Sequence, residues 1–274
     1  MTNILEQIIA HKKTEIAGLD VQALRRAAES SPAPRNFLFA IKRCRNTSSP
    51  SLIAELKRAS PSKGILAPHL NLFQVADIYT QNGASAISVL TDEKFFMGKL
   101  ETLRELRFTR ESKLPLLRKD FIVEKVQLYE SRANGADAIL FIAAALLDDK
   151  HLADLHALTL ELDLTPLVEV HNEVETERAL KLKDARLIGI NNRDLATFEV
   201  SLEATERICP MIPDHITVVA ESGICTAGDV ERLAHANVDA ILVGEALITS
   251  EDIGAKVREL SGTRVPSPSG RGLG

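Results

Sequence analysis

The sequence predicts an α/β fold, a (β/α)8 TIM barrel preceded by an N-terminal helical extension. From residue 51 onward, apolar runs typical of buried parallel strands alternate with stretches in which apolar residues recur at helical spacing. Eight such units in about 210 residues fit a closed barrel covered by helices. The eight runs are LIAEL (52–56), AISVL (86–90), LPLLR (114–118), AILFI (138–142), PLVEV (166–170), LIGIN (187–191), TVVAE (217–221) and AILVG (240–244).

The junctions between helices and strands support the same fold. Three of them nearly repeat one another, reading QNGASAISVL, RANGADAILFI and HANVDAILVG. Each has a helix that ends at Gly or Asn, a short turn and a buried strand. A doubly wound open sheet is the alternative, but its GxGxxG fingerprint should follow the first strand, where this chain reads KRASPSKG.

The chain divides into three parts by pattern. Residues 1–48 have helical spacing without strands and are too few for an independent core, so we expect them to pack on the barrel. Residues 49–261 form the predicted catalytic barrel, and 262–274, rich in Gly, Pro and Ser, are expected to be a disordered tail. Helices are predicted at about 3–17, 21–29, 37–43, 72–83, 124–135, 148–162, 173–182 and 227–237.

Composition excludes several classes of function. The net charge is −5 and aromatic residues make up 4% with no Trp, which disfavours a nucleic-acid surface. No run approaches the roughly 18 apolar residues of a membrane span, and the amphipathic N-terminus does not resemble a signal peptide. Three cysteines without paired spacing indicate reduced thiols, so we expect a cytoplasmic protein. No metal-ligand spacing is present, and no metal site is expected.

The first predicted strand contains two charged residues that need an explanation. Glu55 and Lys57 share one strand face with Ile53, because side chains two positions apart point the same way. Burial of either ion costs several kcal/mol, on the order of 3–5, unless it is paired. The following turn, 60–64, offers hydroxyls, backbone donors and a lysine, which suit an anionic ligand. A surface ion pair followed by a solvated turn is the alternative interpretation.

Polar residues also collect where the other strands end. In a barrel of this type the active site lies at the carboxyl ends of the strands. Ser222, Gly223 and Gly244 follow the last two strands, the loops that often bind phosphate in such barrels. The polar residues at the ends of the third, fifth, sixth and seventh strands are Lys119, Glu169, Asn191 and Glu221.

These residues lie within motifs that resemble the indole-3-glycerol-phosphate synthase family. The resemblance extends in order to about residue 260, and the combination of motifs is highly specific. The motifs are IAELKRASPSKG (53–64), LTDEKFFMG (90–98), LLRKDFIV (116–123), LVEVHN (167–172), IGINNRDLATF (188–198), VAESGI (219–224) and ILVGEAL (241–247).

The resemblance implies a reaction and assigns residues to it. The reaction is cyclisation of 1-(2-carboxyphenylamino)-1-deoxyribulose 5-phosphate to indole-3-glycerol phosphate with loss of CO2 and water, without a cofactor. It needs an acid for the ketone oxygen, an acid for the leaving hydroxyl and a base for the nitrogen-bound proton. By resemblance, Lys119 is the first acid, Glu169 its partner in dehydration, and Lys57 binds the substrate carboxylate and shares proton transfer.

Other positions are expected to hold the substrate. By resemblance, Glu55 fixes the lysines, and Asn191 and Glu221 bind sugar hydroxyls or the anilino nitrogen. Glu245 stands where some relatives have Ser, so its backbone N–H is expected to bind while its carboxylate turns away. The expected phosphate-binding residues are Ser60, Ser222, Gly223 and Gly244, and the expected aryl walls are Phe95, Phe96 and Phe121, any of which could instead belong to the core.

Two alternatives to the synthase follow from the same fold. Phosphoribosylanthranilate isomerases place a Cys near the end of the first strand, where this chain has Glu55 and Lys57, and pentulose-phosphate epimerases use paired acids and a metal. A non-catalytic barrel subunit would be expected to lose proton-transfer residues, whereas all are present here. The expected partner is a phosphosugar substrate, without nucleic acid or membrane, and with possible weak association with other enzymes of the tryptophan pathway.

Overall fold

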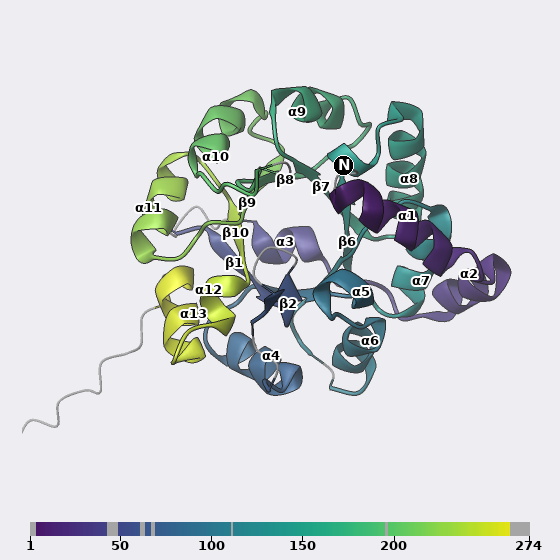
Figure 1. Ribbon diagram of the computed structural model, residues 1–274, viewed down its shortest axis with the longest axis horizontal. Coiled ribbons are helices and arrows are strands. Elements are labelled where there is room, and N and C mark those ends of the chain that lie inside the picture. Colours follow the sequence, from purple (N-terminus) through teal and green to yellow (C-terminus); the bar gives the residue numbers. More distant parts are fainter. Residues whose placement is uncertain are drawn as a thin grey trace, which may run out of the picture.

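The computed structural model describes residues 4–42, 49–60, 64–66, 69–110, 112–194 and 197–263, apart from the side chain of Ser60. Eight parallel strands form a closed barrel in the order β1-β10-β9-β8-β7-β6-β5-β4, ringed by helices (Figure 1). The predicted fold and all eight predicted strands are confirmed. The strands are β1 (Ser51–Leu56), β4 (Ala86–Leu90), β5 (Leu116–Lys119), β6 (Ala138–Ile142), β7 (Thr165–Val170), β8 (Leu187–Asn191), β9 (Thr217–Glu221) and β10 (Ala240–Val243).

Helices follow the strands and cover the outside of the barrel. Several begin where a side chain caps free backbone N–H groups, as Asp148 does for those of Lys150 and His151. The helices that follow the strands are α4 (Leu72–Gln81), α5 (Glu93–Phe96), α6 (Leu100–Phe108), α7 (Lys125–Ala133), α8 (Asp149–Glu161), α9 (Glu173–Leu180), α10 (Glu203–Ile208), α11 (Ala227–His235), α12 (Glu245–Ile248) and α13 (Ile253–Ser261). Sequence patterns did not specify five of these helices, namely α5, α6, α10, α12 and α13.

Alternation along β1 sorts its side chains as predicted. Leu52, Ala54 and Leu56 are buried in the core between the barrel and its helices. Ile53 belongs instead to a second core inside the barrel, together with Leu117 and other apolar residues of the strands. Glu55 follows Ile53 on the inner face, so the polar end of the barrel lies directly above an apolar floor.

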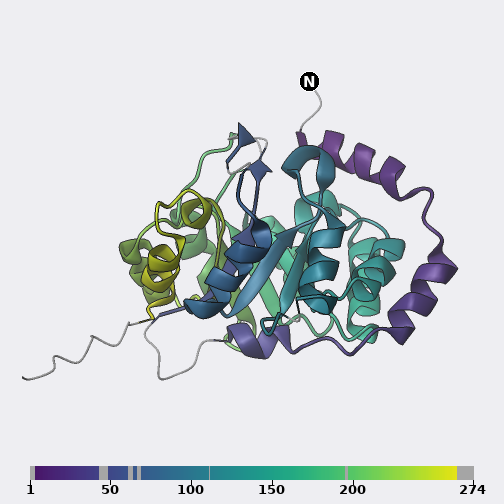
Figure 2. The same ribbon diagram turned by 90° about the horizontal axis from the view of Figure 1, so that it is seen from below.

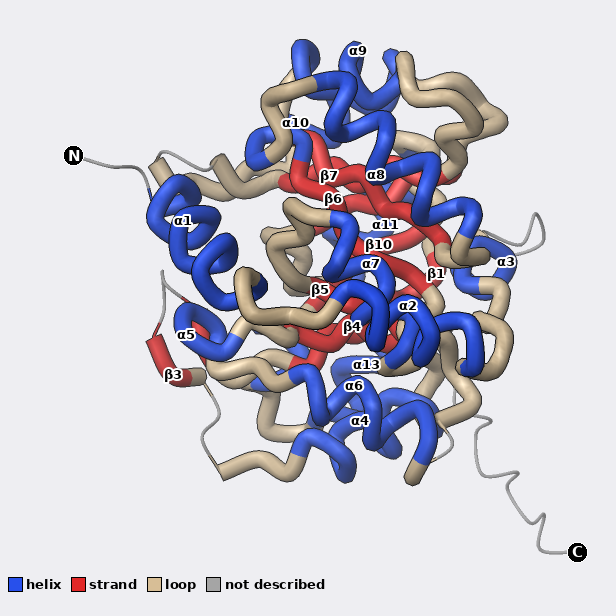
Figure 3. The backbone as a smooth tube through the Cα atoms, turned by 90° about the vertical axis from the view of Figure 1, so that its right-hand side faces the viewer, coloured by secondary structure: helices blue, strands red, loops and turns tan. Residues whose placement is uncertain are grey.

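The N-terminal helices contact both ends of the barrel. They are α1 (Ile4–Ile16), α2 (Val21–Ser30) and α3 (Phe37–Ile41). In Figure 2, α1 lies at one end and α3 at the opposite end, and Figure 3 shows the same arrangement from the side. Phe37 and Ile41 of α3 are fully buried and join the core inside the barrel. Burial of such a side chain contributes about 1.5–3 kcal/mol, so α3 forms a stable plug at the closed end.

Helix α1 is held at the other end by a buried ammonium group. Lys12 is fully buried, and its Nζ lies 3.0 Å from Asp120 Oδ1, 3.1 Å from Asp92 Oδ2 and 3.0 Å from Glu15 Oε2. Burial opposes the charge, but Asp120 and Asp92 outweigh it and raise the pKa of Lys12 to about 12. The cluster therefore joins α1 to the segments that follow β4 and β5.

The segment after β1 forms a small hairpin. Strands β2 (Ala59–Ser60) and β3 (Gly64–Ile65) pair antiparallel, and this hairpin lies at the same end of the barrel as α1 (Figure 2). A turn was expected here, and 61–63 lie outside the described residues. The division of the chain at residues 48 and 261 stays a prediction, and 264–274 also lie outside the described part.

Candidate active site

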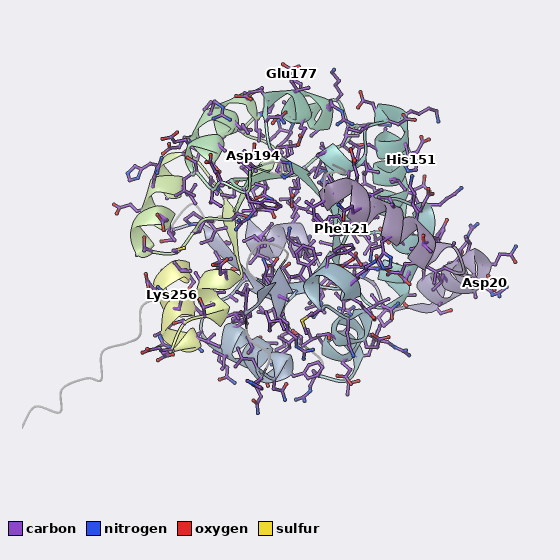
Figure 4. All side chains as sticks on the ribbon, viewed as in Figure 1. Asp20, Phe121, His151, Glu177, Asp194 and Lys256 are labelled. Atoms are coloured by element: carbon purple, nitrogen blue, oxygen red, sulfur yellow. The ribbon has the colours of Figure 1, made fainter. Side chains whose placement is uncertain are left out.

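A cavity of about 450 Å³ opens where the barrel strands end. It is lined by residues of the strand ends and by Ile4, Leu5 and Ile8 of α1. Phe121, one of its lining residues, lies near the middle of the ring in Figure 4, whereas Asp20 lies far outside it. The predicted site residues that line the cavity are Glu55, Lys57, Phe96, Lys119, Phe121, Glu169, Asn191, Glu221, Ser222, Gly223, Gly244 and Glu245.

Lys119 lies between two carboxylates at the centre of the site. Its Nζ is 3.1 Å from Glu169 Oε2 and 3.1 Å from Glu221 Oε2, and its side chain is 16% exposed. Burial disfavours the ammonium, but Glu169, Glu221 and Glu55 outweigh it and raise the pKa of Lys119 above its ordinary value. Lys119 is therefore a stable cation in the free protein.

Glu169 receives several positive or polar partners. Besides Lys119, Asn191 Nδ2 donates a 3.0 Å hydrogen bond to its Oε1, and His171 Nε2 lies 3.2 Å from the same oxygen. Burial favours the neutral acid, but Lys119 and His171 outweigh it and hold the pKa of Glu169 well below its ordinary value. Glu169 is therefore ionised at neutral pH.

Glu221 has the opposite environment. It is buried, and although Oε2 is at ion-pair distance from Lys119, neither carboxyl oxygen has a well-aligned hydrogen bond within the described part of the chain. Burial is the largest effect, and with the nearby Glu169 it outweighs Lys119 and raises the pKa of Glu221 to about 8. The pKa values of two carboxylates that share one cation are thus shifted in opposite directions.

Two glycines make room for the carboxylates inside the barrel. A Cβ at Gly189 would lie 2.3 Å from Glu221 Oε1, and one at Gly244 would lie 2.6 Å from Glu55 Oε1. Glu55 Oε1 in turn lies 3.5 Å from Lys57 Nζ. Gly244 was expected to approach phosphate, and the structure gives it this additional reason to lack a side chain.

The loop after β9 has the backbone shape expected of a ligand-binding turn. Ser222 and Gly223 have φ angles of 67° and 78°, in the left-handed region. A Cβ at Gly223 would also lie 2.4 Å from Val200 Cγ1. Together with Gly244 and Glu245 they form one side of the cavity. The direction of the Glu245 carboxylate stays a prediction.

Two of the three phenylalanines expected to contact the aryl ring line the cavity. Phe96 and Phe121 line the cavity, with ring centroids 5.9 Å apart. Phe95 is not among the lining residues, and its ring meets His11 edge-on at 5.9 Å, so its role as a wall for the aryl ring stays a prediction. The short helix α5 turns these two neighbours to different sides. The Ser60 side chain lies outside the described residues.

Comparison with known proteins identifies the family. The sequence profile described as indole-3-glycerol phosphate synthase matches residues 5–260. The chain is similar to proteins named indole-3-glycerol phosphate synthase from Polaromonas naphthalenivorans, at 46% identity over 96% of this chain and 100% of that protein, and from Dehalococcoides mccartyi, at 55% over 76% and 80%. The chain belongs to the indole-3-glycerol phosphate synthase family.

Solved structures agree on the fold of this synthase. A 3-hexulose-6-phosphate synthase from Salmonella typhimurium has a TM-score of 0.62 at 13% identity and covers 77% of this chain and 97% of its own. A mutant tryptophan synthase α-subunit from Pyrococcus furiosus has a TM-score of 0.56 at 17% identity, covering 77% and 98%. At these identities the likeness concerns the barrel alone.

Family membership confirms the predicted activity. The synthase is a decarboxylating lyase of tryptophan biosynthesis, which sets aside the isomerase, the epimerase and the non-catalytic subunit. No helix in the described ranges is long and apolar enough to cross a bilayer. The same residues contain no group of three His, Cys, Asp or Glu side chains placed to hold a metal ion.

Sequence patterns missed several residues of the synthase site. Phe198 lines the cavity, although only the motif that contains it was noted, and Arg193, a polar residue at the end of the sixth predicted strand, lines it without having been assigned a role. The contribution of α1 could not be inferred, because its apolar residues fit any packed helix. His171 lies inside the motif LVEVHN, but nothing in the sequence links it to Glu175 rather than to solvent.

Proposed function

We propose that Lys119, Glu169 and Glu221 perform the proton transfers by which this enzyme closes and aromatises the indole ring. The observation that supports this proposal is one ammonium held 3.1 Å from each of two carboxylates whose pKa values are shifted in opposite directions. Such a cluster supplies both an acid and a base at neutral pH within reach of one ligand.

Ring closure is the first step. The aromatic carbon that bears the substrate carboxylate attacks the ketone carbon, and the ketone oxygen gains negative charge. Lys119 stabilises this charge and donates a proton to the oxygen. An alkoxide is a far stronger base than an amine, so the raised pKa of Lys119 does not prevent the transfer. CO2 then leaves, and the electrons of the broken bond restore the aromatic ring.

Dehydration is the second step. Glu221, protonated in the free enzyme, donates its proton to the departing hydroxyl, and Glu169 accepts the proton that the new five-membered ring loses. Two protons are donated and one is accepted. The solvent supplies the difference, because a substrate carboxylate departs as neutral CO2.

The remaining predicted residues are proposed to hold the substrate. Backbone N–H groups of the loop at Ser222 and Gly223 and of the segment at Gly244 would bind phosphate, with Lys57 nearby. Phe96 and Phe121 would contact the aryl ring, which their apolar surfaces suit. Ser60 remains a candidate for the phosphate, and Glu55 and Asn191 would orient Lys57 and Glu169.

Replacement of Lys119 tests the assignment. Incubation with 1-(2-carboxyphenylamino)-1-deoxyribulose 5-phosphate, followed by indole absorbance, measures turnover directly. Lys119→Met should abolish turnover while phosphate-dependent binding survives. Lys150→Met, at an exposed position of α8, is the matched control and should behave as the unmodified chain. Persistent turnover by Lys119→Met would transfer the acid role to Lys57.

Cell location and partners remain part of the proposal. The net charge of −5 and the sparse cysteines support a cytoplasmic enzyme that acts on a small phosphosugar and does not bind nucleic acid. Weak association with other tryptophan-pathway enzymes is proposed as well. Light scattering of mixtures of the purified enzymes would test it.

A further inference from the structure

His171, the residue after β7, lies between two carboxylates. Its Nδ1 is 2.9 Å from Glu175 Oε2 on α9, and its Nε2 is 3.2 Å from Glu169 Oε1 on β7. The second contact is an ion-pair contact without good hydrogen-bond alignment. The imidazole is 7% exposed and is not among the residues that line the cavity, so it lies behind Glu169 as seen from the substrate.

This geometry favours a charged ring. A neutral imidazole has one N–H and one lone pair, and here the lone pair would face an anionic oxygen whichever nitrogen carried it. Only an imidazolium presents N–H groups to both carboxylates. Burial disfavours that charge, but Glu169 and Glu175 outweigh it and raise the pKa of His171 to about 10.

Glu175 is fixed as the anionic partner of the ring. Its Oε2 also accepts a 2.9 Å hydrogen bond from the backbone N–H of His171, and its Oε1 accepts one of 2.8 Å from Asn172 Nδ2. Asn172 in turn caps α9 by accepting from the backbone N–H of Glu175. Donors therefore contact both carboxylate oxygens of Glu175 and hold Oε2 against the imidazole.

Glu169 and Glu221, the two carboxyl groups beside Lys119, differ in whether His171 is also a neighbour. Glu169 has the imidazolium behind it as a second cation, with Asn191 on the same oxygen. Glu221 faces the close-packed backbone at Gly189 instead, and Lys119 Nζ, 3.1 Å from its Oε2, is the cation beside it. The charged groups facing His171 are Glu169 from β7 and Glu175 from α9, while Lys119 from β5 lies on the far oxygen of Glu169.

We infer that His171 is a positioning residue which, held as an imidazolium by Glu175, keeps Glu169 ionised and thereby assigns the base to Glu169 and the acid to Glu221. The inference rests on the proposed function for the part that concerns catalysis. The protonation state of His171 does not depend on that function, which allows the two to be tested separately.

The first test measures the ring in the free enzyme. Long-range ¹H–¹⁵N correlation spectra report whether each imidazole nitrogen carries a proton, and His171→Gln identifies the relevant signal among those of the seven histidines. Both nitrogens of His171 should stay protonated from pH 6 through pH 8. Titration near the ordinary histidine pKa of about 6.5, or a single protonated nitrogen at pH 7, would overturn the inference.

The second test follows kcat against pH. With the imidazolium removed, the pKa of Glu169 rises, so the acid-side fall in kcat should move upward by about one pH unit or more in His171→Gln, a tenfold effect at fixed acidic pH. Glu175→Gln should move it in the same direction, and the double variant should resemble His171→Gln, because Glu175 acts through His171. His235→Gln, an exposed histidine on α11, is the control.

The outcomes separate the inference from the proposed function. A fall in kcat with an unmoved acid limb would make His171 merely structural and overturn the inference. Additive effects of the two single variants would also overturn it. If Lys119→Met remained active while His171 proved to be an imidazolium, the proton-transfer scheme would fail and the charge state would stand. A variant that does not fold leaves the spectrum of the unmodified enzyme to decide.

Discussion

Glu169 and Glu221 illustrate how a few ångströms of surroundings decide what a carboxyl group can do. Both touch the Lys119 ammonium at 3.1 Å, and both are buried. Asn191 and His171 also contact Glu169, whereas Glu221 faces the backbone at Gly189. The proposed roles of acid and base therefore rest on the neighbours of each carboxyl group and not on residue type.

Replacement of Glu221 by Gln should remove the acid while its shape is retained. We expect kcat to fall by about 10²–10⁴, the usual contribution of a positioned acid. In the unmodified enzyme kcat should decline as pH rises through about 8, where Glu221 loses its proton. This decline should be absent from the residual activity of Glu221→Gln. An unchanged basic limb in the variant would assign that limb to another group.

Stability gives an independent measure of the same group. The pKa of Glu221 in the folded protein, about 8, lies above its unfolded value of about 4.3, so its contribution to stability is complete below that value and is lost as pH rises through 8. Glu221→Gln should therefore gain free energy of unfolding relative to the unmodified chain at pH 9 compared with pH 5. Urea unfolding at the two pH values measures the difference.

Gly189 should matter through the side chain that it accommodates. In Gly189→Ala the new Cβ would meet Glu221 Oε1, the end of a flexible side chain, so the barrel should fold while Glu221 moves. We expect kcat to fall at least about tenfold, since misplacement by about 1 Å can cost 10²-fold. Gly228→Ala on α11, where the nearest atom is 3.6 Å from the new Cβ, is the matched control and should keep full activity.

At the scale of elements, α1 is bound to the barrel mouth through charge as well as apolar contact. Lys12 meets Asp92 and Asp120, and Asp120 also accepts from Arg118 and Thr91. Asp120 directly follows Lys119 in sequence. The position of α1 over the cavity and the backbone that carries the central lysine are therefore parts of one buried network.

Lys12→Met should loosen this helix. It leaves Asp92 and Asp120 with less compensation in a buried site, a loss of about 3–5 kcal/mol in the free energy of unfolding. Urea unfolding measures the loss, and limited proteolysis should show earlier cleavage in 4–16. Lys13→Met, one position along on the exposed side, should remain within about 0.5 kcal/mol of the unmodified chain. Equal effects of both variants would contradict the buried network.

Elements differed in how well the sequence predicted them. The eight strands were predicted because apolar runs of four to six residues between helical patterns are a local signal. The position of Lys12 was not, because a lysine in an amphipathic helix resembles any solvated one until its distant partners are known. The sequence could not tell that Phe96 lines the cavity while Phe95 contacts His11, because α5 has only four residues and little periodicity.

At the scale of the molecule, the apolar packing of α3 and the ionisable cluster lie at opposite ends of the barrel. The inner core at the α3 end is apolar, whereas the cavity end carries the ionisable cluster. Sequence predicted the barrel and the convergence of charged strand ends upon one mouth, because both follow from alternation and strand order. It did not predict that α3 fills the far end, since nothing local to 37–41 specifies which surface it covers.

Phe37→Ala should lower stability without lowering catalytic activity. Loss of a fully buried aromatic ring costs about 3–5 kcal/mol, so the free energy of unfolding should drop while kcat at 25 °C stays within about twofold. Phe39→Ala on the same helix, where the ring is 79% exposed, should change neither quantity. A large loss of kcat in folded Phe37→Ala would show that the plug reaches the chemistry.

The plug formed by Phe37 and Ile41 also determines the end of the barrel at which substrate and product can exchange with solvent. Because packed side chains fill the barrel at the α3 end of the described chain, we expect the phosphosugar to enter, and carbon dioxide, water and the indole product to leave, through the cavity beside α1. A product molecule that is still bound in this cavity excludes the next substrate molecule. Inhibition by the indole product should consequently be competitive with substrate, and variants that bind the phosphate group more weakly should also be inhibited more weakly by the product.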